Sequence, residues 1–168
     1  MLSLILAGPA TALEVGQRAP DFTLAAPGGK LVTLADLLAK GPVILYTFLD
    51  AANKTCIDEI GGFQKHLAQF EAAGVQIVGV SSDHVANLDA FIRANKITHL
   101  LLSDYRRRML PAYGALVTDD RSLIAQEGKR SYFIIDRQGI IRYLKTEDNA
   151  LERLKPEELL RAFKESGA

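Results

Sequence analysis

The sequence predicts an α/β fold, a three-layer sandwich in which helices cover a mixed central sheet that carries an N-terminal hairpin. From residue 42 onward, short apolar runs alternate with amphipathic segments, which indicates strand–helix units and a parallel core. Two apolar segments joined by a tight turn near the end add antiparallel strands. With 168 residues and 48% hydrophobic content, the chain can bury one sizeable core, so we expect one domain over residues 13–168.

The first predicted elements are a hairpin and a strand–helix unit. Two short alternating segments flank the turn sequence 27–29, Pro-Gly-Gly. The apolar run 42–49 then predicts a central strand covered on both faces. In the helix that follows, apolar residues recur at helical spacing and Gly74 ends the helix. The residues of this apolar stripe are Ile60, Phe63, Leu67 and Phe70.

The same pattern continues to the end of the chain. We expect strands at 75–82, 98–104, 130–136 and 140–146, and helices at 85–96, 106–114 and 155–166. The helix at 106–114 is short because Pro111 interrupts it, and Pro156 occupies the first turn of the last helix. Residues 115–128 are polar and weakly periodic, which predicts a long loop.

Composition excludes several classes of partner. Twenty basic and twenty acidic residues cancel, and the largest basic cluster is the triplet Arg106–Arg108, so we expect no nucleic-acid partner. No apolar run is long enough to span a bilayer, so we expect no membrane partner. The three histidines lie far apart in the sequence without ligand spacing, and we expect no metal and no other cofactor.

The first twelve residues, MLSLILAGPATA, allow two interpretations. A short apolar stretch, a helix-breaking Gly8-Pro9 pair and the small residues Ala10 and Ala12 are parts of a signal peptide, whereas a basic first region is missing. The segment is therefore either a signal peptide or an N-terminal extension. Localisation stays open between cytoplasmic and exported.

Cys56 is the only cysteine, and it stands where the apolar strand 42–49 gives way to a helix. A single cysteine excludes an intramolecular disulfide, a CxxC pair and a multi-thiolate zinc site. Helix amides at such a position favour a thiolate, which makes Cys56 a candidate nucleophile. The alternative is a buried structural cysteine.

A series of segments makes a family resemblance specific: VGQRAPDFTL, YTFL, CIDEIGGF, VGVSSD, LLLSD, AYG and RSYFIIDRQGIIRY. In their order and spacing over residues 14–166, the chain resembles the peroxiredoxins, thiol peroxidases with a thioredoxin-like fold. It is most similar to the bacterioferritin-comigratory (Q-type) and related one-cysteine members. The resemblance implies reduction of hydrogen peroxide or small organic hydroperoxides, with Cys56 as the peroxidatic cysteine, Arg130 as the active-site arginine and Glu59 as its partner.

The chemistry agrees with this transfer of residues. Peroxide reduction needs a thiolate and compensation for developing negative charge, and a helix N-terminus with a guanidinium supplies both. We therefore expect Arg130 near the Cys56 sulfur and a Cys56 pKa below the free value of about 8.5. Arg130 as a surface residue, and Glu59 as a first-turn residue favoured by the helix dipole, are the structural alternatives.

Two positions depart from the family pattern. Leu49 and Asn53 replace the proline seven residues and the threonine three residues before the cysteine. An Asn53 amide can still donate to and accept from a peroxide, whereas the direction of the Thr55 hydroxyl is not predictable. Gly61 stands where many Q-type members have a resolving cysteine. A one-cysteine cycle is implied, with an external thiol reductant that is a thioredoxin-like protein or a low-molecular-weight thiol.

Other functions remain open at this point. Leu49 and Asn53 are compatible with a catalytically weakened redoxin-fold protein that acts as a redox sensor or binding module. A cysteine hydrolase would need a base near Cys56, and His66 lies almost three turns farther along the same predicted helix. The sequence leaves a monomer and a homodimer as alternatives.

Overall fold

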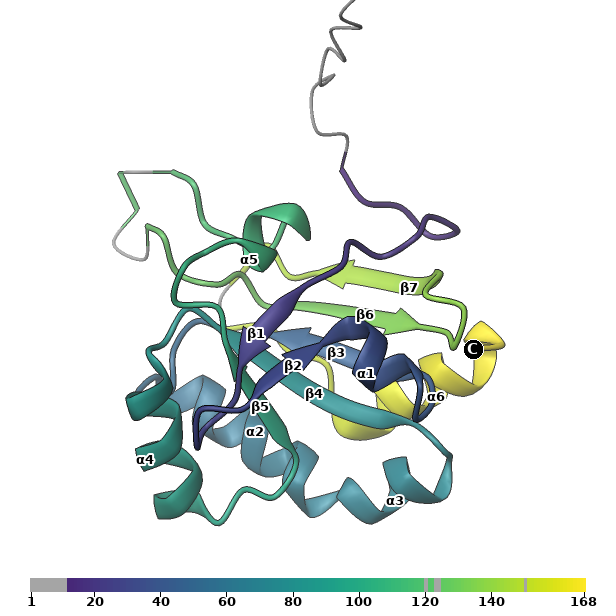
Figure 1. Cartoon of the computed structure of the whole chain (residues 1–168), viewed down its shortest axis with the longest axis horizontal. Helices are drawn as coiled ribbons and strands as arrows, with labels where there is room; N and C mark the ends of the chain where they lie inside the picture. The colour runs from purple at the N-terminus through teal and green to yellow at the C-terminus, as the bar shows by residue number, and fades with distance from the viewer. Residues whose placement is uncertain (1–11, 120, 123–124, 150) are drawn as a thin grey trace, which may run out of the picture.

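A computed structural model of the chain describes residues 12–119, 121–122, 125–149 and 151–168. The first eleven residues of the segment that we considered as a signal peptide or extension lie outside the described residues. The elements, shown in Figure 1, are β1 (Thr23–Ala25), β2 (Leu31–Thr33), α1 (Leu34–Leu38), β3 (Val43–Thr47), α2 (Lys54–Lys65), α3 (Leu67–Ala72), β4 (Gln76–Ser81), α4 (Val85–Asn95), β5 (Leu100–Ser103), α5 (Met109–Ala112), β6 (Ser131–Ile135), β7 (Ile141–Thr146) and α6 (Pro156–Ser166).

The strands form one mixed sheet in the order β2-β1-β5-β4-β3-β6-β7. The central strands β3, β4 and β5 are parallel, whereas β6, β7 and the hairpin β1–β2 pair antiparallel. This arrangement confirms the predicted α/β fold, because right-handed strand–helix–strand connections produce parallel neighbours and tight turns produce antiparallel ones.

The sheet separates two hydrophobic clusters, and the alternation of side chains along β3 shows the division. Val43 and Leu45 join the cluster that includes α1 and α5, whereas Ile44 and Tyr46 join the cluster beneath α2, α3, α4 and α6. All of β3 is buried, as the continuous apolar run predicts. In Figure 1 the longer helices α2 and α4 lie on one side of the sheet and α1 on the other, which gives the three layers.

The structure differs from the sequence expectation in two local features. The alternating segment after the turn ends in a short helix, α1, because Thr33 and Asp36 form a reciprocal capping box. The single helix expected up to Gly74 is interrupted at His66, whose backbone leaves the helical region at φ −102° and ψ 7°. The His66 ring contacts the carbonyl of Gly62 at 2.9 Å, which adds a side-chain partner at the last turn of α2.

Throughout the described part of the chain, no helix combines the length and the apolar character that crossing a bilayer would need. The parallel strands β3 and β4 end side by side, so the loops that follow them lie at the same edge of the sheet. The functional residues predicted from the sequence gather at this edge.

Candidate active site

Cys56 lies in the first turn of α2, directly after the loop that leaves β3. Asn53 is the N-cap, and its Oδ1 accepts hydrogen bonds from the backbone N–H of Thr55 at 2.9 Å and of Cys56 at 3.4 Å. An amide at this position forms a favourable cap, which fixes where the helix begins. The Cys56 side chain is completely shielded from solvent, with 0% exposure.

Arg130 lies directly before β6, the antiparallel neighbour of β3, and approaches Cys56 from there. The Thr47 hydroxyl donates to the carbonyl of Lys129 and accepts the N–H of Ser131 at 3.1 Å, so it holds the backbone on both sides of Arg130. The Arg130 side chain is buried, and its Nη2 donates to the Cys56 Sγ at 3.4 Å. The structure therefore brings these two residues together, although 74 positions separate them in the sequence.

Glu59 lies one helical turn after Cys56 and faces the same guanidinium. Arg130 Nε donates to Glu59 Oε2 at 2.8 Å, and both side chains are buried. The second carboxylate oxygen, Oε1, accepts a hydrogen bond from the Tyr132 hydroxyl. A buried carboxylate with these two donors has the partners that compensate for its removal from water.

Burial dominates the electrostatics of the site. Burial raises the pKa of the Cys56 thiol, while hydrogen bonds from the backbone of Asp50 and Leu49 and the charge of Arg130 oppose that rise. Our sequence expectation of a lowered pKa is therefore wrong for the thiol in this structure, because it counted the donors without the loss of solvent.

The ion pair beside the thiol responds to the same burial. Burial raises the pKa of Glu59, against the opposing effects of Arg130 and the Tyr132 hydroxyl. Burial also disfavours the charge of Arg130, but the Glu59 carboxylate, together with Cys56 and Tyr132, outweighs this effect, and the pKa of Arg130 is raised. The guanidinium therefore stays charged next to the Cys56 sulfur.

The departures from the family pattern have defined positions. Asn53 uses its Oδ1 on the helix cap and also accepts the Thr55 hydroxyl at 2.5 Å, so this oxygen is directed at α2. The Thr55 oxygen in turn lies 3.4 Å from Arg130 Nη2, which places this hydroxyl beside the thiol. Leu49 is buried in the cluster that contains Cys56, where it supplies apolar cover.

Sequence reasoning missed Asp83, which holds the loop before Cys56. Its Oδ2 accepts the backbone N–H of Ala51 at 2.9 Å and the Ser81 hydroxyl at 2.8 Å. Asp50 binds the same loop through the N–H groups of Ala52 and Asn53. The available signal was the position of Asp83 just after a strand that we expected to lie parallel to β3, since the ends of parallel strands meet at one edge.

Tyr132 was also missed, although it stands two residues after Arg130. Side chains two apart on a strand share a face, so this spacing was the signal that could have found it. The Tyr132 hydroxyl accepts the backbone N–H of Leu154 at 3.0 Å, and Arg130 Nη1 donates to the carbonyl of Glu152 at 3.1 Å. The segment that leads into α6 is thus part of the site.

No histidine supplies a base for a cysteine hydrolase in the part of the chain that the structure describes. His66 caps the far end of α2, where its Nε2 lies 3.0 Å from a Glu157 carboxylate oxygen. His99 bonds to Tyr46 and Gln64, and His84 caps α4. Within the described residues, no group of His, Cys, Asp and Glu side chains has the arrangement of a metal site.

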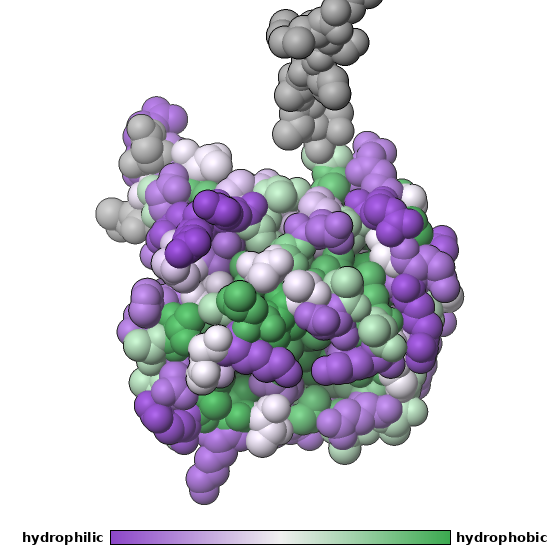
Figure 2. Space-filling view, viewed as in Figure 1, coloured by the Kyte–Doolittle hydropathy of each residue, from purple (hydrophilic) through white to green (hydrophobic). Residues whose placement is uncertain are grey.

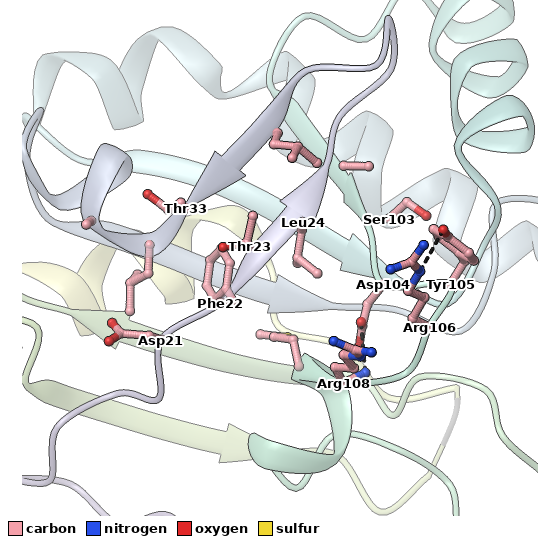
Figure 3. Close-up of a pocket in the computed structure, with 15 residues that line it drawn as sticks. Asp21, Phe22, Thr23, Leu24, Thr33, Ser103, Asp104, Tyr105, Arg106 and Arg108 are labelled. Carbon is pink, nitrogen blue, oxygen red and sulfur yellow. Dashed lines mark hydrogen bonds between the residues drawn. The ribbon is translucent and has the colours of Figure 1, made fainter.

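A groove of about 780 Å³ lies between the hairpin, α1 and the turn that connects β5 to α5. Figure 3 shows Tyr105 and Arg106 turned toward each other at one end of this groove, with Arg106 Nε donating to the Tyr105 hydroxyl at 2.8 Å. Figure 2 shows hydrophobic surface in the middle of the face viewed in Figure 1. Leu31, which lines the groove, is 62% exposed. None of the residues that line this groove belongs to the thiol site.

Comparisons with known proteins agree with the geometry. The profile of the AhpC/TSA family matches residues 15–144. The chain is 35% identical over 130 residues to "Putative peroxiredoxin bcp" of Coxiella burnetii, which covers 77% of the chain and 85% of that protein. It is 28% identical over 129 residues to peroxiredoxin Q, chloroplastic, of Triticum aestivum, which covers 77% of the chain and 57% of that protein.

Solved structures show the same fold. A peroxiredoxin-like protein from Aquifex aeolicus matches with a TM-score of 0.83 and 24% identity, over 93% of this chain and 89% of that one. Reduced Prx3 from Vibrio vulnificus, determined in complex with hydrogen peroxide, matches with a TM-score of 0.80 and 25% identity, over 90% of this chain and 99% of that one. The chain belongs to the AhpC/TSA family, as a thiol peroxidase of the bacterioferritin-comigratory (Q) type with a thioredoxin-like fold.

Proposed function

We propose that Cys56 is the peroxidatic cysteine of a one-cysteine cycle that reduces hydrogen peroxide or small organic hydroperoxides. The observation that carries this proposal is the hydrogen bond of 3.4 Å from Arg130 Nη2 to the Cys56 sulfur at the first turn of α2. This contact supports a role for Arg130 in stabilising the thiolate and the charge that develops on the peroxide oxygens. Glu59 orients the guanidinium through its 2.8 Å ion pair.

The proposed reaction begins with attack of the Cys56 thiolate on one peroxide oxygen. The O–O bond breaks, the attacked oxygen stays on the sulfur, and the other oxygen leaves as hydroxide or alkoxide. The leaving group takes up the proton that the thiol released on ionisation and becomes water or an alcohol, while the sulfur is oxidised by two electrons to a sulfenic acid. Because the Cys56 side chain is 0% exposed, peroxide reaches the sulfur only after the covering residues move.

Reduction of the sulfenic acid requires a thiol from outside the chain, since Cys56 is the only cysteine. A first external thiol forms a mixed disulfide with Cys56 and releases water. A second thiol then attacks the external sulfur, which regenerates the Cys56 thiolate and leaves an external disulfide. A thioredoxin-like protein or a low-molecular-weight thiol fits this role. The peroxidase itself acts as a monomer or a homodimer.

Stopped-flow oxidation of the reduced protein by hydrogen peroxide, followed by trapping of a sulfenic acid with dimedone, tests the proposal. We expect one equivalent of peroxide to be consumed and the dimedone adduct to lie on Cys56. Cys56→Ser is the matched control and should show neither effect. A wild-type rate equal to that of a free thiol at the same thiolate fraction would contradict the proposal.

A weakened redoxin that acts as a redox sensor or binding module is the second candidate, favoured by complete burial of the thiol and by the engagement of Asn53 Oδ1 on the helix cap. The two candidates differ in what Asn53→Thr does. For a peroxidase, Asn53→Thr preserves or increases the rate of Cys56 oxidation. If wild type reacts as slowly as a free thiol and only Asn53→Thr gains activity, the weakened redoxin is the better description.

A further inference from the structure

Tyr132 is a tyrosine with 0% exposure whose hydroxyl lies between the thiol site and the segment leading into α6. The hydroxyl oxygen accepts the backbone N–H of Leu154 at 3.0 Å and contacts Glu59 Oε1. A backbone N–H only donates, so the phenol proton cannot be directed at Leu154. The Tyr132 proton therefore points toward the Glu59 carboxylate, which is the arrangement expected for an ionised glutamate.

Glu59 is consequently held from two directions. Its Oε1 receives the Tyr132 hydroxyl, and its Oε2 receives Arg130 Nε at 2.8 Å. An arginine and a carboxylate commonly form a bidentate pair, with both oxygens on the guanidinium. Here Tyr132 engages Oε1 while Arg130 Nε engages Oε2, and Arg130 Nη2 lies on the Cys56 sulfur at 3.4 Å.

We propose that Tyr132 is a positioning residue of the thiol site: its hydroxyl holds the Glu59 carboxylate in an orientation that keeps the Arg130 guanidinium on the Cys56 sulfur. The inference rests on the proposed function, in which Cys56 is the reacting group. The backbone N–H of Leu154 fixes the Tyr132 hydroxyl, so the segment before α6 contributes to this alignment through a main-chain donor.

Tyr132→Phe tests the proposal because it removes the hydroxyl and keeps the ring. Glu59 can then turn both oxygens to Arg130 and draw the guanidinium away from the sulfur. We expect the midpoint of the pH profile of Cys56 alkylation to rise by about 0.5 to 1 pH unit. We also expect peroxide reduction at pH 7 to slow by about three- to tenfold, the effect of one hydrogen bond.

Tyr113→Phe is the matched control. Tyr113 is also a buried tyrosine, it packs in the other hydrophobic cluster, and its hydroxyl donates to the Pro20 carbonyl at 2.7 Å. The control therefore loses a comparable buried hydrogen bond that has no connection to Arg130. Its alkylation profile should superimpose on that of wild type, although both variants lose stability.

Among the described residues, the remaining titratable groups that act on Glu59 or the thiol are Tyr46 from β3 and Arg153 before α6, and neither changes in Tyr132→Phe. Loss of the Tyr132 hydroxyl also raises the pKa of Glu59, and a protonated Glu59 would move the thiol profile to lower pH. A shift to higher pH therefore reports the alignment of Glu59 and Arg130. A Tyr132→Phe profile identical to wild type, or displaced to lower pH, overturns the proposal. A peroxide-inactive wild type whose alkylation profile still responds to Tyr132→Phe contradicts the proposed function and leaves the positioning role supported.

A second measurement covers the case in which Tyr132→Phe does not fold. Site-specific 3-fluorotyrosine in place of Tyr132 keeps both the ring and the hydroxyl. Its fluorine resonance should shift over the pH range in which Cys56 ionises, because the hydroxyl is linked to the sulfur through Glu59 and Arg130. A resonance that stays constant over that range overturns the proposal.

Discussion

Replacing Arg130 with methionine removes the one charge that contacts the Cys56 sulfur among the described residues. At 3.4 Å and an effective dielectric constant of about 20, the Coulomb energy of this pair is at most about 5 kcal/mol. The Glu59 carboxylate, whose Oε2 lies 2.8 Å from Arg130 Nε, cancels part of this Coulomb energy. A charge-assisted hydrogen bond contributes about 1.5–3 kcal/mol, so we expect the Cys56 pKa to rise by about 1 to 2.

The kinetic consequence follows from the thiolate population. At pH 7 the fraction of Cys56 thiolate should fall about 10- to 100-fold, and the rate of oxidation by hydrogen peroxide should fall at least as much. Alkylation of Cys56 as a function of pH measures the pKa, and stopped-flow oxidation measures the rate. Arg142→Met is the control, because it breaks a 2.6 Å ion pair with Asp136, which does not contact Cys56.

Loss of Arg130 also leaves Glu59 buried without its ion-pair partner, at a cost of about 3–5 kcal/mol in the free energy of unfolding. The double variant Glu59→Gln with Arg130→Met removes this unpaired charge and should recover much of the stability without recovering the pKa of Cys56. If the alkylation profile of Arg130→Met coincides with that of wild type, the arginine does not stabilise the thiolate and our reasoning is refuted.

Other expected outcomes concern positions around the site. Asn53→Ala should reduce the rate of Cys56 oxidation by about tenfold to a hundredfold. It should also destabilise the fold by about 1 kcal/mol, because it removes the α2 cap, whereas Asn53→Thr should preserve both the rate and the stability. Equal oxidation rates in wild type and both variants would exclude Asn53 from peroxide binding. Burial lowers the pKa of His99 to about 4. As the pH falls below about 6.5, His99 therefore takes up a proton in the unfolded chain before it does so in the folded chain. The free energy of unfolding should fall by about 3 kcal/mol by pH 4 for this reason. The difference in unfolding free energy between wild type and His99→Gln should shrink over this range, and a constant difference would contradict the assignment. Gly128→Ala should destabilise the fold by about 1–3 kcal/mol in chemical denaturation, because its Cβ would overlap the backbone carbonyl of Phe48, and an unchanged midpoint would show that the backbone yields easily.

The sequence by itself determined the order of the elements and the position of the thiol. Apolar runs and helical spacing depend on local chain geometry, so they predicted the buried β3, the stripe that includes Ile60 and Phe63, and the start of α2 close to Cys56. The interruption at His66 was not predictable, because its contacts with the Gly62 carbonyl and with Glu157 on α6 form only in the folded chain.

Only the tertiary structure decided how the site is connected. The family resemblance pointed to Cys56, Glu59 and Arg130, and the spacing of Tyr132 from Arg130 was a signal for a shared face. No sequence pattern says that the Tyr132 hydroxyl and the main chain of Glu152 and Leu154 complete the hydrogen bonds. The pKa direction of Cys56 likewise depends on how much water the folded chain removes from the sulfur. Local spacing fixes which residues share a strand or helix face, whereas burial and long-range contacts are properties of the assembled layers.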